Sequence, residues 1–357
     1  MLLILRFARS VLILNIVIVN IFRGEIIMVE SYYLFASGDL RRKDNVVRLT
    51  TKDKRFKDIK VDVTRDIFLF GNVNTNTDCL NYLSAKQIPL HLFNYYGYYT
   101  GSFYPKEVNV SGSLLIQQVL HYVDEHKRIK IAQEIILAAS YNILRNLRYY
   151  KQRGKDVEAE YKQIRALRKT IPRTDNIQEL MGIEGNIRST YYRSWTAIIN
   201  QKIDFERRTK RPPVNMINAL ISYLNSLMYT SCLSEIYVSQ LNPTISYLHS
   251  AGDRRFSLSL DISEVFKPLI VDRLIFSLLN KKIITENDFI KESNFCYMKQ
   301  TAQQKIIAAY DVRLEDTIKH RDLNRNVSYR RLLRLECYKL IKHLTSDKEY
   351  EGFKIWW

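Results

Sequence analysis

The sequence predicts an α+β protein in which a small N-terminal β-sandwich or single antiparallel sheet is followed by a larger all-helical domain. Between Ser31 and Tyr104, short β-branched and aromatic runs alternate with charged or Gly/Asn turns, which is typical of strands. After Ser111, apolar residues recur three and four positions apart almost to the end, which indicates helices. A chain of 357 residues is long enough for two cores, and we place the domains at 28–108 and 109–357.

Residues 1–27 fit neither domain. The uncharged run from Ser10 to Phe22 is shorter than the roughly 18 residues that a membrane-spanning helix needs, and no small-residue cleavage site follows it. Met28 opens the strand-like pattern. We therefore expect 1–27 to be an upstream extension from a misassigned start, with a targeting segment as the alternative.

The β domain is expected to begin with strands and to contain one short helix. Its strand-like runs are SYYLFAS, NVVRLTT, IKVDVT, DIFLFGNV, IPLHLFNYY and YYTGSFY. The segment TDCLNYLSAKQ predicts a helix capped by Thr77 or Asp78. Tyrosines crowd the last hairpin, around Gly97. They are suited to stacking on nucleic acid bases, but we favour a sheet face or a subunit interface.

Helical periodicity then marks a series of segments, with no repeat period that would indicate a solenoid. Pro213 is expected near the first turn of one helix, where its missing N–H costs nothing. The predicted helices are SLLIQQVLHYV, KIAQEIILAASYNILRNLRYY, EYKQIRALRKT, NIQELMGIEGNIRSTYYRSWTAII, PVNMINALISYLNSLMYTSCLSEIYV, SEVFKPLIVDRLIFSLLNKK, AQQKIIAAYDVRL and YRRLLRLECYKLIKHL.

Composition indicates a folded protein that binds a polyanion. The net charge is +18, and 46% of residues are apolar, too many for a disordered basic tail. With 11 Gly and 7 Pro there is no glycine-rich phosphate loop. The 4 cysteines never form a CxxC pair, which argues against a zinc cluster and a disulfide framework and favours a cytoplasmic setting.

Basic residues gather in three places. The densest stretch runs from Arg145 to Arg173 and includes Arg165 and Arg168; the others are 207–211 and the pair Arg254 and Arg255. A single basic run is usually a solvated helix face. Three runs in one domain favour binding to nucleic acid phosphates.

Glu184 is a candidate metal ligand because enzymes that act on phosphodiesters commonly use a divalent cation. In MGIEGNIRSTYYRSW, a helix would place Glu184, Arg188 and Tyr191 on one face. The flanking Gly182 and Gly185 each cost about 1 kcal/mol in a helix, which suggests close approach of another backbone or a ligand. The alternative is an ordinary Glu184–Arg188 surface pair.

His249 is a second candidate, in the irregular stretch before Asp261. Asp261 and Glu264 have the spacing of a capping box, which predicts that a helix begins there. Such a helix start would allow Glu264 to face a cation. The alternatives are purely structural roles for the histidine and for both acids.

Four ordered motifs resemble the CRISPR-associated integrase family, which inserts new spacers into a repeat array. They are MGIEGNIRSTYYRSW, RPPVNMINALISYLNSLMYT, LNPTISYLH and RFSLSLDISEVFKPLIVDR. The likeness runs from Met28 to about residue 345 and includes YYLFASGDLRRKDN, FGNV and PLHLFNYYGYYTGSFYP. It is most similar to the integrases of type I-B systems, and residues 1–27 have no counterpart in it.

The resemblance implies a β-sandwich domain, an all-helical catalytic domain, a homodimer and a small ferredoxin-like partner subunit. It implies that Glu184, His249 and Glu264 bind Mg²⁺ or Mn²⁺, with Asp261 as the neighbouring acid. Arg188 and Tyr191 or Tyr192 would hold DNA near the metal.

We therefore expect a metal-dependent DNA endonuclease and integrase of CRISPR adaptation, in which a 3′-hydroxyl attacks a phosphodiester. One alternative is a catalytically silent DNA-binding or scaffold subunit on the same fold. The other is a membrane-tethered basic helical protein that uses residues 1–27 as its anchor.

Overall fold

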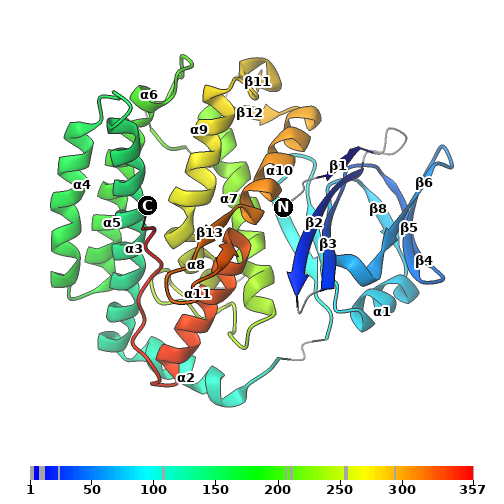
Figure 1. Ribbon diagram of the computed structural model, residues 1–357, viewed down its shortest axis with the longest axis horizontal. Helices are drawn as coiled ribbons and strands as arrows, with labels where there is room; N and C mark the ends of the chain where they lie inside the picture. Colours follow the sequence, from blue (N-terminus) through cyan, green and yellow to red (C-terminus); the bar gives the residue numbers. More distant parts are fainter. Residues whose placement is uncertain are drawn as a thin grey trace. The chain divides into compact units, whose positions relative to one another are not determined.

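The computed structural model describes residues 4–7, 13–22, 25–106, 109–205, 207–209, 212–252, 256–292 and 295–356. The chain divides into two compact units, Met1–Val108 and Asn109–Trp357. The first is rich in strands and the second in helices (Figure 1). The predicted α+β class, with the β-rich part first, is confirmed. Across the described ranges, no helix is long and apolar enough to cross a membrane.

The described part of the first unit contains two sheets. One has six strands in the order β1-β2-β3-β7-β9-β10, and the other has four in the order β6-β5-β4-β8. Both are mixed, because β3–β7, β7–β9 and β4–β8 pair in parallel. The elements are β1 (Ile4–Phe7), β2 (Ile13–Phe22), β3 (Glu25–Leu34), β4 (Gly38–Lys43), β5 (Val46–Thr51), β6 (Phe56–Lys60), η1 (Val61–Val63), β7 (Thr64–Leu69), β8 (Val73–Thr75), α1 (Thr77–Ala85), β9 (Leu90–Phe93) and β10 (Tyr99–Phe103).

The purely antiparallel prediction was wrong because the chain switches sheets. It leaves β3 to build β4, β5 and β6 in the second sheet and then returns to place β7 beside β3. Strands β1 and β2 precede Met28, and the expected start at Met28 stays a prediction.

Buried side chains from both sheets and from α1 form one core, among them Leu34, Leu49, Leu69 and Leu83. Helix α1 is capped by Asn76, whose side chain accepts the N–H of Cys79, and not by Thr77 or Asp78 as expected. Asn76 has the extended backbone that a capping residue needs, and the helix already includes the next two residues.

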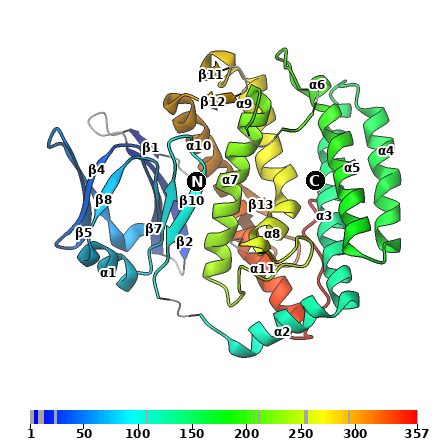
Figure 2. The same ribbon diagram turned by 180° about the vertical axis from the view of Figure 1, so that it is seen from behind.

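The second unit is built from helices that include a long, almost wholly buried α7 (Figures 1 and 2). The helices are α2 (Gly112–Val123), α3 (Glu125–Lys151), α4 (Glu158–Thr170), η2 (Ile171–Arg173), α5 (Ile177–Arg193), α6 (Trp195–Ile198), α7 (Met216–Tyr237), α8 (Ser257–Lys267), η3 (Pro268–Asp272), α9 (Arg273–Asn280), η4 (Glu286–Asp288), α10 (Gln300–Glu315) and α11 (Tyr329–Leu344). Helix α7 is buried on nearly all sides, and its buried acid Glu235 is paired with Arg334.

Two short hairpins correct the prediction that this unit is all helical. Strands β11 (Phe289–Glu292) and β12 (Phe295–Met298) form one, and β13 (Thr317–Lys319) and β14 (Asn326–Ser328) form the other. Strands of this length carry too few residues for alternation to show. Pro213 also lies outside α7, which begins after its cap Asn215; the carbonyl of Pro213 accepts the N–H of Cys296 instead.

The junction of α8 and α9 is a π-helical turn, η3, that fixes where the candidate site residues lie. Pro268 cannot donate a backbone hydrogen bond, so the regular ladder is interrupted there. Two buried asparagines of α3 bond to the carbonyls around this turn: Asn142 Nδ2 to Val265 O at 2.9 Å and Asn146 Nδ2 to Pro268 O at 2.7 Å. Helix α3 therefore holds α8 and η3 in register.

Candidate functional site

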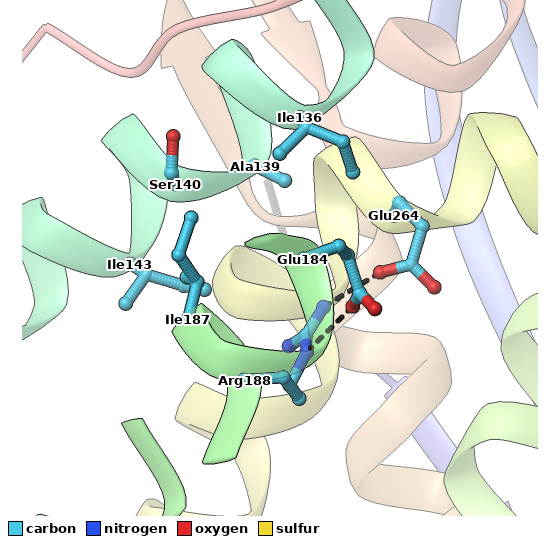
Figure 3. A pocket seen from close by; sticks show the side chains of 8 residues that line it. All are labelled: Ile136, Ala139, Ser140, Ile143, Glu184, Ile187, Arg188 and Glu264. Atoms are coloured by element: carbon cyan, nitrogen blue, oxygen red, sulfur yellow. Dashed lines mark hydrogen bonds and ion pairs between the residues drawn. The ribbon is translucent and has the colours of Figure 1, made fainter. Parts of the chain in front are cut away.

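Glu184 and Glu264 come from different helices and share one cation, Arg188. Glu184 lies on α5 and Glu264 on α8 (Figure 3). Arg188 Nη2 donates to Glu264 Oε2 at 2.6 Å, and Arg188 Nε lies 3.7 Å from Glu184 Oε1. The predicted Glu184–Arg188 pair is present, but only 14% of the Arg188 side chain is exposed, so it is not the solvated surface pair of the alternative interpretation.

Two further charged residues belong to this cluster and were missed from the sequence. Lys267 Nζ donates to Glu264 Oε1, and Asp272 Oδ2 lies 3.6 Å from Arg188 Nη1. Both are almost completely buried. A usable signal was present: Lys267 and Asp272 interrupt the apolar run VFKPLIVDRLIF, and charged groups in such a run need partners.

Asp261 is a buried loop anchor and not a helix cap. Helix α8 begins at Ser257, so Asp261 and Glu264 both lie inside it, and the predicted capping box was wrong. The fully buried Asp261 carboxylate accepts the backbone N–H groups of Tyr247, Leu248 and His249 at 2.6, 3.0 and 3.1 Å. The position of Asp261 in the sequence is thus explained by its contact with residues 247–249, not by a helix start.

The same carboxylate orients the imidazole of His249, whose Nδ1 lies 2.8 Å from Asp261 Oδ1. Burial lowers the pKa of His249, but its hydrogen bond to Asp261 and the charges of Asp261 and Glu264 outweigh burial, so the pKa is raised above 6.5. A carboxylate on Nδ1 fixes the ring and leaves Nε2 as the nitrogen available to a ligand.

The pKa values of the two glutamates are displaced in opposite directions. Burial, followed by the charge of Glu264, raises the pKa of Glu184. Burial would also raise the pKa of Glu264, but the charges of Lys267, Arg188 and His249 dominate and lower it to about 2. Glu264 is thus a carboxylate held by cations, whereas Glu184 is compensated less, and burial raises the pKa of the neighbouring Asp272 to about 7.

A small hollow of about 10 Å³, roughly the room that one water molecule needs, lies against these carboxylates (Figure 3). Ile136, Ala139 and Ile143 of α3 form an apolar wall, and the charged groups of the two glutamates and Arg188 lie opposite. One side of the hollow is therefore apolar, and the other carries charge.

The donor set suits a divalent cation by its chemistry. Two carboxylates and one imidazole with a carboxylate behind it match the ligands of Mn²⁺ well and those of Mg²⁺ acceptably. Across the described residues, no three acid, His or Cys side chains form a group that could hold an ion, and Arg188 contacts both glutamates instead.

The predicted DNA contacts have mixed outcomes. Tyr191 is fully buried and its hydroxyl accepts from Asn146 Nδ2, so this side chain packs the core and offers no surface to DNA. Arg165 is exposed on α4, whereas Arg168 is half-buried and its Nε donates to Leu137 O at 3.4 Å. Arg254 and Arg255 lie outside the described residues.

The two glycines beside Glu184 face open space. A Cβ added at Gly182 or Gly185 would meet no atom of the described chain within 4 Å. Packing against another segment of this unit, one of the two reasons expected for them, was therefore wrong. Close approach of a ligand stays a prediction.

The comparisons with known proteins agree with one another. The family model "CRISPR associated protein Cas1" matches residues 32–312. A CRISPR-associated endonuclease Cas1 of Fusobacterium nucleatum is 54% identical over 94% of this chain and 99% of its own length. The solved structure of a Cas1 protein from Thermotoga maritima is 39% identical, covers 91% of this chain and 100% of that one, and has a TM-score of 0.81.

More distant structures share the fold. A casposase bound to an integration product has a TM-score of 0.77 at 20% identity, over 90% of this chain and 92% of that one. A Cas6-RT-Cas1–Cas2 complex has a TM-score of 0.78 at 17% identity, over 91% of this chain and 36% of that one. From the family match and the high identity to its relatives, this chain belongs to the Cas1 family of CRISPR-associated proteins.

Proposed function

We propose that this chain is a divalent-metal-dependent DNA endonuclease and integrase that inserts foreign DNA fragments into a CRISPR repeat array. Membership of the Cas1 family and the close relatives named endonucleases support this activity. The type I-B subtype is part of the same proposal and rests on the resemblance of the motifs.

The observation that carries the proposal is that Glu184 of α5 and Glu264 of α8 meet at one buried cation, Arg188, while Asp261 of α8 holds the His249 ring. The charge of His249 lowers the pKa of both Glu184 and Glu264, and the charge of Glu264 raises those of Glu184 and His249. Charges act on one another in this way when they lie in the same part of the molecule. Glu184, His249 and Glu264 are therefore the residues that would hold Mg²⁺ or Mn²⁺.

Each residue has a definable task. Asp261 fixes the His249 ring and the loop that carries it. His249 must be neutral to offer Nε2, and the two glutamates supply negative charge next to the incoming phosphate. A divalent cation bound there supplies neutralisation of the phosphate charge and activation of the attacking 3′-oxygen.

DNA would be held by the basic surface next to this site. Helix α4 packs against both α3 and α5, and the three helices lie side by side in both views (Figures 1 and 2). Most of the basic residues between Arg145 and Arg173 are exposed, including Arg148, Lys162 and Arg165. Their phosphate contacts would make binding strongly dependent on salt.

The proposed partners are double-stranded DNA, a second copy of the chain and a small ferredoxin-like adaptation subunit. The distant structures with this fold support two of these, because one is described with an integration product and one with Cas2. The homodimer rests on the family resemblance.

The test separates DNA binding from DNA joining. Glu184→Ala, His249→Ala and Glu264→Ala are assayed for binding of a DNA fragment by fluorescence anisotropy and for strand transfer into a repeat-containing plasmid with Mn²⁺ and the partner subunit. We expect retained binding and loss of joining in all three. The exposed acid Asp156 gives the matched control, Asp156→Ala, which keeps both. Unchanged joining in the three variants would favour the catalytically silent scaffold.

A further inference from the structure

We propose that Arg188 is a displaceable counter-ion that neutralises Glu184 and Glu264 in the metal-free protein, and that Asp272 receives its guanidinium when a divalent cation binds. The inference rests on the proposed metal site and adds two positioning residues to it.

Arg188 is placed for this task because it reaches three acids from three elements. Its Nη2 bonds to Glu264 at 2.6 Å, its Nε lies 3.7 Å from Glu184, and its Nη1 lies 3.6 Å from Asp272. The guanidinium thus contacts both glutamates proposed as ligands and lies beside their carboxylates (Figure 3). A cation held by both carboxylates would have to share this space with it.

Asp272 can accept hydrogen bonds that it does not accept from the described part of the chain. Its side chain is 4% exposed, and its Oδ2 has no hydrogen-bond partner among the described residues. The 3.6 Å separation from Arg188 Nη1 is too long for a hydrogen bond. An unsatisfied buried carboxylate oxygen is costly, so a second arrangement that satisfies it is expected.

Lys267 is not an equivalent candidate. It bonds to Glu264 from one turn away on the same helix, and its ammonium lies 4.9 Å from the centre of the Tyr229 ring. It therefore touches only one of the two glutamates. Arg188 is the described cation that bridges both and also reaches Asp272.

The charges of the cluster explain why the guanidinium would move. Glu184, Glu264 and Asp272 supply three potential negative charges against the two positive charges of Arg188 and Lys267. A divalent cation at the glutamates would repel the guanidinium that contacts both of them. Reorienting the Arg188 side chain toward Asp272 keeps it paired in a buried environment, where an unpaired charge is very costly. Since Nη1 already lies close to Asp272, α5 itself need not move.

The test is a double-mutant cycle read out as Mn²⁺ affinity by isothermal titration calorimetry without DNA. Asp272→Asn should weaken Mn²⁺ binding about 10- to 100-fold, the range typical of residues that support metal ligands. Arg188→Gln removes the competitor and should bind Mn²⁺ at least as tightly as the wild type. The double variant should match Arg188→Gln, because Asp272 acts only through Arg188.

The cycle distinguishes the inference from simple electrostatics. If Asp272→Asn weakens binding equally in both backgrounds, Asp272 acts on the cation directly and the inference is wrong. Thermal unfolding without metal identifies variants that fail to fold. Glu315→Gln alters a buried acid paired with Arg330, far along the chain, and is the matched control with unchanged affinity.

A different result would refute the proposed function itself. If Glu184→Gln and Glu264→Gln bind Mn²⁺ like the wild type, the metal site itself is wrong. If they lose binding while the cycle is additive, the metal site stands and only the displacement of Arg188 is refuted.

Discussion

Replacing Asp261 with Asn should destabilise the loop that carries His249 far more than a change of one atom suggests. The Asp261 carboxylate accepts four hydrogen bonds: three from the backbone N–H groups of Tyr247, Leu248 and His249, and one from the His249 ring. Asn offers one acceptor oxygen, so one pair of these donors loses its partner and meets an NH₂ group. At about 1–3 kcal/mol for each buried donor left unsatisfied, we expect a loss of about 2–6 kcal/mol.

The assay is urea unfolding combined with amide hydrogen exchange. Exchange should accelerate strongly in Asp261→Asn at Tyr247 and Leu248 if the NH₂ group replaces Oδ2, or at His249 if it replaces Oδ1. In the second case DNA joining should also fall, because the His249 ring loses its acceptor. The exposed change Asp156→Asn serves as the control and should alter the free energy of unfolding by less than about 0.5 kcal/mol. A loss below about 1 kcal/mol with unchanged exchange would refute the anchoring role of Asp261.

Four further predictions follow from the same contacts. The pKa of His249 is raised above 6.5, so the stability that its protonated ring contributes is full below pH 6.5 and is lost as the pH rises through the raised pKa. DNA joining needs the neutral ring and should instead fall as the pH drops through that pKa. Paired pH profiles of unfolding and of joining would check both. Gly185→Ala should stabilise the chain by about 1 kcal/mol in urea unfolding, since its Cβ meets nothing, and a loss of stability would contradict this geometry. Arg165→Gln should reduce the salt dependence of DNA affinity by about one unit of slope; an unchanged slope would remove Arg165 from the DNA surface. Mn²⁺ at 100 times its Kd should raise the free energy of unfolding by about 2.7 kcal/mol in the wild type, measured by thermal shift, and this gain should be absent in Glu264→Gln.

The sequence identified the elements better than it identified the contacts between them. Helical periodicity located α3, α7 and α11, because each buries many apolar side chains that recur three and four residues apart in the sequence. The short hairpins of the second unit were missed because three- and four-residue strands leave no such pattern. The parallel pairing of β3 with β7 depends on a return of the chain that no local signal encodes.

In the candidate site, too, contacts within one helix were predicted and contacts between elements were missed. Glu184 and Arg188 were predicted to share a face because they are four residues apart on one helix. The role of Asp261 was misread, because a carboxylate three residues before a glutamate fits a helix start as well as a position inside α8. Asp272 could not be connected to Arg188 from the sequence, since their contact depends on how η3 packs against α5.

The anomalous scattering of manganese, in a crystal of the protein grown or soaked with Mn²⁺, would show directly which residues bind the cation. We expect a single strong peak bound by the carboxylates of Glu184 and Glu264 and by Nε2 of His249, with the Arg188 guanidinium against Asp272. A peak bound by other residues, with Arg188 still bridging the two glutamates, would contradict this expectation.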